Sequence, residues 1–190
     1  MAFRNIATRL VAPSSSSLQQ GVRHYTVGTN VFKTCPEGLT FIDQANRKHP
    51  IKDIFSNKNV VVVGCTGLHP VDQFQLIPSY VKNADKIYSK GVDYIVSLST
   101  LDAPMLKANR ISLDPKIRLT HLCDENAEFA EANKLCEDIN MESLGVMDAS
   151  VRRYKRFVLI VNNGNIVYES AESNPDDCSH TDATAVLAHL

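Results

Sequence analysis

The chain has 190 residues, of which 44% are apolar and 22% charged, a composition typical of a domain with one hydrophobic core. Its formal net charge of -1 gives no electrostatic reason to expect a nucleic acid or an anionic membrane as a partner. No apolar run approaches the length that crosses a bilayer, and the five cysteines include no C-x-x-C pair, which favours reduced thiols over a disulfide framework.

The first thirty residues differ in composition from the rest. They contain three arginines and a run of four serines, and the first acidic residue of the chain is Glu37. An amphipathic segment rich in arginine and serine and free of acids is typical of a mitochondrial transit peptide, although a disordered basic tail is the alternative. Arg23-His24-Tyr25 resembles a cleavage site of a matrix protease. We therefore predict a cleaved transit peptide over residues 1–25, a domain over residues 26–190, and a location in the mitochondrial matrix.

The strongest structural pattern is the run of four valines at 60–63, closed by Gly64. Such a short β-branched run predicts a central strand that is buried on both faces. Asp72 follows at the start of a predicted helix, as its N-cap or in its first turn, where free N–H groups and the helix dipole favour an anion. Pro78 lies inside this helix and is expected to kink it. Spacings of three and four predict that one face of the helix carries Phe74, Ile77, Val81, Ala84 and Tyr88.

The other elements follow from shorter patterns of the same kinds. Further strands are predicted at 39–42, 92–99, 117–122, 157–161 and 166–168. Further helices are predicted at 103–109, after the turn at 124–126 with Phe129, Ala132 and Leu135, and at 181–190. Strands that alternate with helices, followed by a hairpin and a closing helix, predict an α/β domain of the thioredoxin-like fold, with a central mixed sheet flanked by helices.

The order of these elements and the local sequence resemble a known family, the peroxiredoxins, and within it the type-five, or type II, redoxin subfamily. The resemblance spans nearly all of the predicted domain. It rests on 60–64 and the loop after it, Pro78-Ser79-Tyr80-Val81, Lys90-Gly91-Val92-Asp93, Leu101-Asp102, Lys107-Ala108, Asp124 with Phe129, Leu144-Gly145 and Lys155-Arg156-Phe157.

The loop after the valine strand departs from the pattern of that family. The family loop reads like G-x-P-G-A-F-T-P-x-C; its cysteine attacks a peroxide oxygen, while a threonine and a distant arginine hold the thiolate and the substrate. Residues 64–72 read GCTGLHPVD, with Thr66 at the first proline of the pattern, and this loop is one residue shorter. A gap before Pro70 puts Asp72 at the position of the peroxidatic cysteine, and an alignment without a gap puts Gln73 there. Neither alignment supplies a thiol.

The chemistry of peroxide reduction does not tolerate that exchange. It needs a thiolate of low pKa that takes an oxygen atom to become a sulfenic acid, and a carboxylate is a poor nucleophile toward the O–O bond. We therefore predict a peroxiredoxin-like protein without thiol peroxidase activity, retained for a binding, regulatory or structural role. Its degenerate pocket consists of Thr66, Gly67, Pro70, Asp72 and Arg156.

The resemblance also implies that Arg156 points toward Asp72. We predict a buried or half-buried ion pair, in which the cation and the N–H groups of the helix keep Asp72 ionised. The alternative is that Asp72 is an exposed N-cap. The neighbouring Arg152, Arg153 and Lys155 are interpreted as the solvated start of a strand.

An enzymatic alternative uses another thiol. Cys65 directly follows the valine strand, and Cys178 lies near the place where some relatives carry a resolving cysteine. A thiol peroxidase or glutathione-linked oxidoreductase in peroxide detoxification would use one of them, although ordinary packing is the favoured interpretation of both. A third alternative is an assembly subunit of a larger mitochondrial complex.

Metals, cofactors and partners leave weaker signals. His121-x-Cys123 and Cys178-x-His180 could in principle supply four metal ligands, but they lie far apart in the chain and ordinary packing is favoured. We predict no metal and no cofactor. The sequence names no protein partner; a homodimer is predicted because relatives often dimerise, and neither a nucleic acid nor a membrane is predicted as a partner.

Overall fold

The computed structural model describes residues 27–140 and 150–190. For residues 139, 140, 150 and 151 it describes the backbone alone. The predicted transit peptide and its cleavage site lie outside the described residues. Within the described ranges, no helix is both long enough and apolar enough to span a bilayer.

The sequence alternates strands with helices. The strands are β1 (Thr40–Asp43), β2 (Lys48–Pro50), β3 (Asn59–Gly64), β4 (Tyr94–Ser99), β5 (Thr120–Cys123), β6 (Cys136–Asn140), β7 (Ser150–Tyr154), β8 (Phe157–Asn162) and β9 (Asn165–Ala171). The helices are α1 (Val31–Thr34), α2 (Ile51–Phe55), the π-helix η1 (Asp72–Leu76), α3 (Ile77–Tyr88), α4 (Ala103–Leu113), α5 (Glu128–Ala132) and α6 (Ala183–Leu187).

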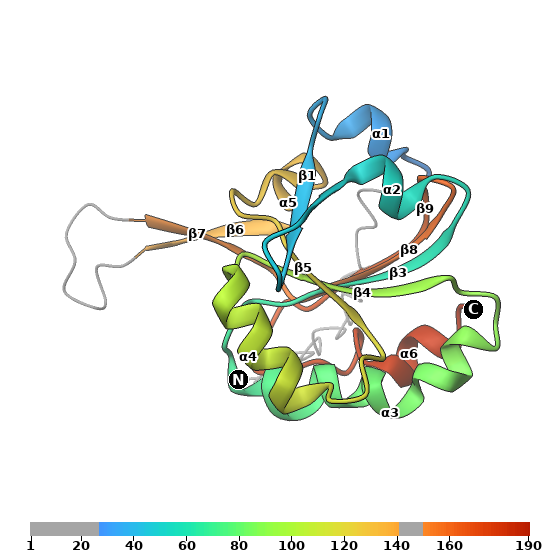
Figure 1. Cartoon of the computed structure of the whole chain (residues 1–190), viewed down its shortest axis with the longest axis vertical. Helices are drawn as coiled ribbons and strands as arrows, with labels where there is room; N and C mark the ends of the chain where they lie inside the picture. Colours follow the sequence, from blue (N-terminus) through green and yellow to red (C-terminus); the bar gives the residue numbers. More distant parts are fainter. Residues whose placement is uncertain (1–26, 141–149) are drawn as a thin grey trace, which may run out of the picture.

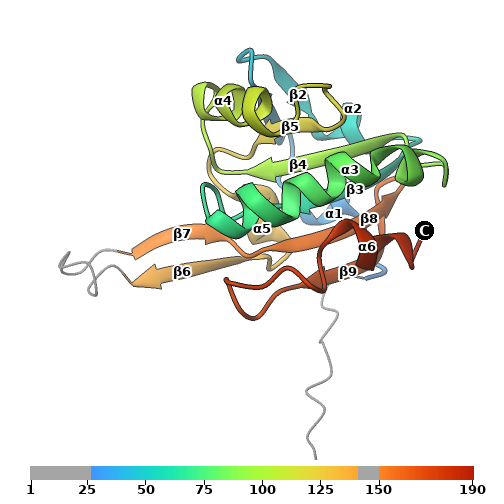
Figure 2. The ribbon, with the colours of Figure 1, turned by 90° about the horizontal axis from the view of Figure 1, so that it is seen from below.

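Seven of the strands form one mixed sheet in the order β2-β1-β5-β4-β3-β8-β9. β3 lies inside the sheet, parallel to β4 and antiparallel to β8. Helices α1, α2 and α5 cover one face of the sheet, and α3, α4 and α6 cover the other (Figures 1 and 2). The predicted fold class, a thioredoxin-like α/β fold with a central mixed sheet, is confirmed.

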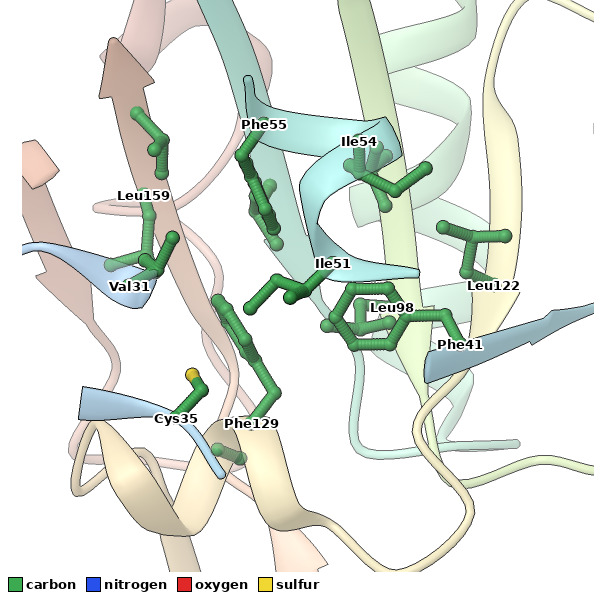
Figure 3. Packing of buried hydrophobic residues seen from close by; sticks show 14 of the residues in the cluster. Val31, Cys35, Phe41, Ile51, Ile54, Phe55, Leu98, Leu122, Phe129 and Leu159 are labelled. Carbon is green, nitrogen blue, oxygen red and sulfur yellow. The ribbon is translucent and has the colours of Figure 1, made fainter. Parts of the chain in front are cut away.

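The four valines of β3 divide between two hydrophobic cores. Val60 and Val62 point into the core under α1, α2 and α5, and Val61 and Val63 point into the core under α3 and α6. Alternate residues of a strand face opposite sides, so a strand covered on both faces is apolar at every position. In the first core, the rings of Phe55 and Phe129 stack with their centroids 5.9 Å apart (Figure 3). The predicted buried central strand is confirmed.

The predicted helix after Asp72 is only partly regular. Its first turn is the π-helix η1, in which the N–H of Ile77 bonds to the carbonyl of Asp72 five residues back. Pro78 therefore lies in the first turn of α3, where a missing N–H is tolerated, and the irregular turn precedes it. The prediction that Phe74 shares the buried face is wrong, because its side chain is 78% exposed. The wider π turn shifts the face of η1 relative to α3, which buries Ile77 and Ala84 as predicted.

The hairpin of β6 and β7 was not predicted; it extends away from the main sheet (Figure 1). Two other local predictions need correction. The strand predicted at 117–122 begins only at Thr120, because Ile117 lies in a turn with a positive φ and is 64% exposed. The short helix α5 ends at Ala132, so Leu135 is buried from the segment that follows it.

Candidate functional site

The register of the central strands brings three distant segments to one point. Gly64, the last residue of β3, is the partner of Phe157, the first residue of β8, and Phe157 in turn is the partner of Ala171 at the end of β9. Arg156, one residue before β8, therefore lies beside the loop that leaves β3. The segment after β9 returns to the same place, where the N–H of Glu172 donates to the carbonyl of Arg156 over 2.9 Å.

Gly64 is required at this junction by packing. A Cβ atom on this residue would lie 2.2 Å from the ring of Phe157, closer than any real contact between carbon atoms. The absence of a side chain lets the ring cover the end of β3. A side chain at residue 64 would therefore force the ring of Phe157 to move.

The carboxylate of Asp72 accepts three hydrogen bonds. Its Oδ1 accepts from Nε of Arg156 over 2.7 Å, and its Oδ2 accepts from the backbone N–H of Thr66 over 2.9 Å and from the Thr66 hydroxyl over 2.7 Å. Asp72 and Arg156 are each 1% exposed. The predicted ion pair is therefore present and buried, and the alternative of an exposed N-cap is wrong.

One part of that prediction needs correction. Asp72 was expected to accept hydrogen bonds from the N–H groups of its own helix, but the carboxylate turns back toward the loop and bonds to Thr66. Asp72 is already the first residue of η1, and Val71 before it has helical backbone angles. A side chain caps N–H groups when its own backbone is extended, which is not the geometry at this position.

The guanidinium of Arg156 is enclosed by acceptors on several sides. Besides Asp72, its Nη1 donates to the carbonyls of Pro175 and Asp177 over 2.6 and 2.7 Å. Its Nη2 lies 3.4 Å from Nδ1 of His69. Four of the five N–H groups of the arginine are thereby directed at atoms of this chain.

His69 completes the group and was not singled out from the sequence. It directly precedes Pro70, so with the gap before Pro70 it stands at the phenylalanine of the G-x-P-G-A-F-T-P-x-C pattern, and the threonine of that pattern falls in the gap. Its Nδ1 faces the backbone N–H of Val71 at 3.3 Å as well as Arg156. Both neighbours can only donate, so Nδ1 accepts and the neutral ring carries its proton on Nε2, 3.5 Å from Oδ1 of Asp176. Its place directly before the proline of this loop was the signal that could have identified this residue.

The other members of the predicted pocket lie around this group. Gly67 has a φ of 122°, a backbone conformation that favours glycine, and Pro70 begins the helical turn before Asp72. The space next to the carboxylate, between Asp72, Cys65 and His121, is a cavity of about 10 Å³. A cavity of that size holds about one water molecule.

Cys65 lies on the buried side of the loop. Its side chain belongs to the core under α3, and its Sγ lies 3.7 Å from Oγ of Ser97. Burial raises the pKa of the Cys65 thiol, and the negative charge of Asp72 raises it further. A buried thiol with a raised pKa is largely protonated near neutral pH, which is the opposite of what a peroxide-reducing cysteine needs.

Cys178 lies in the segment between β9 and α6 and is also buried. Its Sγ lies 3.7 Å from Oε1 of Gln75 on η1. Burial raises the pKa of the Cys178 thiol, although the nearby charge of Arg156 acts in the other direction. Cys178, which the sequence analysis interpreted as an ordinary packed thiol, therefore lies against η1, the helical turn that begins with Asp72.

The four residues weighed as metal ligands do not gather. His121 and Cys123 are buried on β5, where Nε2 of His121 lies 3.4 Å from Oδ2 of Asp114, and His180 is exposed near the C-terminus. Within residues 27–140 and 150–190, no group of three or more His, Cys, Asp or Glu residues is arranged to hold a metal ion.

The basic cluster before β8 divides in two. Arg152 pairs with Glu131 and Asp138, and Arg153 pairs with Glu137 across the β6–β7 hairpin. These arginines are therefore paired with acids at the surface rather than simply solvated, whereas Arg156 turns inward to Asp72. Exposed pairs of this kind contribute little to stability, because solvent screens the charges.

Comparisons with known proteins agree with the fold. The sequence model of the family described as Redoxin matches residues 30–187. The chain is 31% identical over 142 residues to "Peroxiredoxin-2F, mitochondrial" of Oryza sativa subsp. japonica, which covers 74% of this chain and 69% of that protein. It is 30% identical over 141 residues to "Peroxiredoxin Pen c 3" of Penicillium citrinum, which covers 72% and 75% of the two chains.

A solved structure gives the same result. The crystal structure of reduced Prx3 from Vibrio vulnificus in complex with H₂O₂ superposes with a TM-score of 0.73 at 28% identity, over 87% of this chain and 99% of the other. The peroxiredoxin 5 of Alvinella pompejana has the same fold, with a TM-score of 0.67 at 20% identity.

Proposed function

Because this chain belongs to the redoxin family, as a member of the peroxiredoxins, we propose that it is a mitochondrial peroxiredoxin-like protein without thiol peroxidase activity, retained for a binding, regulatory or structural role. The observation that carries this proposal is the buried carboxylate of Asp72, bonded to Arg156 and Thr66. The family pattern has the reacting cysteine at this place. A carboxylate there cannot form the sulfenic acid on which peroxide reduction depends.

The two thiols nearest the pocket support the same conclusion. Cys65 and Cys178 are buried, and burial raises the pKa of each. A peroxidase that used either of them would need a thiolate that is accessible to the peroxide. The enzymatic alternative would therefore require the loop 65–71 or the segment 172–181 to move away from its packed position.

A peroxide-consumption assay tests the proposal directly. The purified protein is mixed with hydrogen peroxide or an alkyl hydroperoxide, with dithiothreitol, thioredoxin or glutathione as the reductant. We expect peroxide loss at the rate of the reductant alone. Turnover that is abolished by Cys65→Ser or Cys178→Ser, but not by the control Cys136→Ser on β6, would refute the proposal and establish the enzymatic alternative.

The location in the matrix rests on the composition of the first 25 residues and on the mitochondrial relative from rice. Import into isolated mitochondria followed by N-terminal sequencing tests it. We expect a mature chain that begins at Thr26 and is protected from added protease by the inner membrane. A chain that stays uncleaved and outside the organelle would contradict this part of the proposal.

A homodimer remains part of the proposal because relatives often dimerise. Analytical ultracentrifugation of the mature chain at micromolar concentrations is the direct test. A sedimenting species with twice the molecular mass of the monomer would support the homodimer. A single monomeric species over the whole concentration range would contradict it.

A further inference from the structure

The hydrogen-bond donors around Asp72 come from segments other than its own helix. Thr66 supplies its backbone N–H and its hydroxyl from the end of β3, and Arg156 supplies Nε from the start of β8. Together they direct three donors at the two oxygens of one carboxylate. We propose that Thr66 and Arg156 form a binding cradle for a small carboxylate, and that the side chain of Asp72 is its built-in ligand.

The cradle is held in place without the help of Asp72. The guanidinium of Arg156 is fixed by the carbonyls of Pro175 and Asp177, at 2.6 and 2.7 Å, and by contact with His69. Thr66 is the second residue after β3, and all six residues of β3 pair with β8. Removal of the Asp72 carboxylate would therefore leave the donors in position and Arg156 buried without a counter-ion. A buried unpaired charge is costly, and this cost would favour the binding of an external anion.

The size of the site selects the ligand. The carboxylate is enclosed by Thr66, Arg156 and the core, and the adjoining cavity has a volume of only about 10 Å³. The cradle would thus accept a carboxylate of one or two carbons and exclude larger acids. In the natural chain the tethered carboxylate has an effective concentration that an external ligand does not match.

Occupation of the cradle by the Asp72 side chain controls which molecules reach the pocket. The inference concerns the pocket of the proposed function and rests on that function in one respect, namely that no thiolate has to approach Arg156. The built-in ligand keeps peroxides and small anions away from the buried guanidinium of Arg156. Asp72 therefore acts as an internal inhibitor of its own pocket as well as a replacement for the reacting sulfur.

Two variants with different missing groups test the cradle. Asp72→Ala keeps the Cβ carbon and lacks only the carboxylate group, so the space that it leaves matches formate. Asp72→Gly lacks both the Cβ carbon and the carboxylate group, so the space that it leaves matches acetate. Urea unfolding of the full chain is followed in sodium formate, sodium acetate and sodium chloride at equal ionic strength. We expect formate to raise the folded-to-unfolded ratio of Asp72→Ala about tenfold at ten times its Kd. For Asp72→Gly, acetate should have the larger effect, and the wild type should respond equally to all three salts.

The controls separate a bound anion from a general salt effect. Thr66→Val in the Asp72→Ala background removes one donor and should weaken the formate effect severalfold, whereas Asp85→Ala, at an exposed ion pair, should show no preference for formate over chloride. Equal responses of both Asp72 variants to formate, acetate and chloride would overturn the proposal. If the variants do not fold in chloride, refolding yields in formate and chloride are compared, and equal yields would overturn it as well.

The readout keeps this proposal separate from the proposed function. Anion-dependent stability of the variants reports on the cradle, and peroxide turnover of the wild type reports on catalysis. Turnover together with anion rescue would refute the lack of activity and leave the cradle in place. Absence of both peroxide turnover and anion rescue would refute the cradle and leave the proposed function in place.

Discussion

Asp72 and Arg156 are separated by 84 positions in the chain, yet Nε of the arginine lies 2.7 Å from a carboxylate oxygen of the aspartate. The pairing follows from the register of β3 and β8, which sets Gly64 opposite Phe157 and so brings the residues that flank them together. His69, from the loop after β3, also contacts this guanidinium, with its Nδ1 3.4 Å from Nη2 of Arg156.

The Asp72→Ala variant should be strongly destabilised in buffers without small carboxylates. It leaves Arg156 buried without its counter-ion, and breaking a buried pair in this way costs about 3–5 kcal/mol. The measurement is the free energy of unfolding from urea titrations monitored by circular dichroism. Asp85→Ala is the matched control, because it breaks an ion pair with Arg118 at the surface and should cost less than about 1 kcal/mol. Equal losses in the two variants would show that burial of the Asp72 pair has no energetic consequence.

Gly64→Ala should also destabilise the protein, through steric overlap with the ring of Phe157. The added Cβ would lie 2.2 Å from that ring, and overpacking in a core typically costs about 1–3 kcal/mol. The test is a double-mutant cycle with Phe157→Leu, whose smaller side chain removes the overlapping atoms. The cost of Gly64→Ala should be smaller in the Phe157→Leu background, and strictly additive losses would contradict the steric explanation.

The thiols should react with iodoacetamide in the order of their exposure. Cys136 is partly exposed, whereas Cys65 and Cys123 are buried. Burial raises the pKa of Cys123 to about 11, with a further contribution from the charges of Glu125, Asp124 and Asp102. At pH 8 we expect mass spectrometry of peptides to find Cys136 modified first, and Cys65 and Cys123 modified only after unfolding. Rapid and selective labelling of Cys65 in the native protein would contradict this order and would favour the enzymatic alternative.

Stability should fall in acid in part because of Asp114. Burial alone would raise the pKa of this carboxyl, but the adjacent ring of His121 and hydrogen bonds from the backbone N–H groups of Arg118 and Leu119 together outweigh it, so the pKa is lowered. The unfolded chain therefore takes up this proton first as the pH falls. The stability that Asp114 contributes is present above its unfolded pKa of about 4 and is lost as the pH falls through its lower folded value. Urea midpoints from pH 6 to pH 3 should fall less steeply for Asp114→Asn than for the wild type.

Asp124 provides the opposite case as a control for that experiment. Burial raises the pKa of Asp124, despite hydrogen bonds from Tyr154 and the first N–H groups of α5. The folded state therefore holds this proton more tightly than the unfolded chain, and the stability gained from protonation is lost as the pH rises through the folded value. The wild type should lose stability relative to Asp124→Asn as the pH rises from 4 to 6, and the reverse trend would contradict the assigned shift.

Much of the fold could be predicted because it depends on short-range patterns. The strand at 60–63 is visible in the sequence as a run of valines. The hairpin of β8 and β9 is visible as the turn Asn163-Gly164 between two apolar runs. Phe74 was assigned to the wrong face because the spacing of three and four assumes a regular α-helix, and the π turn of η1 changes the phase. Side-chain spacing carries no sign of such a turn.

The sequence by itself predicted that Asp72, an oxygen acid, stands at the position of the reacting sulfur, because that prediction depends only on the residue types in one loop. It also predicted most strands of the main sheet and the helices α3 to α6, since local periodicity reports which residues are buried, but it did not predict β2, β6, β7, α1 or α2. Only the tertiary structure decided that Thr66, rather than the helix, binds the carboxylate of Asp72, and that His69 contacts the guanidinium of Arg156. Contacts between distant segments depend on how strands pair and on how the chain leaves them, and no local pattern of residues contains that information.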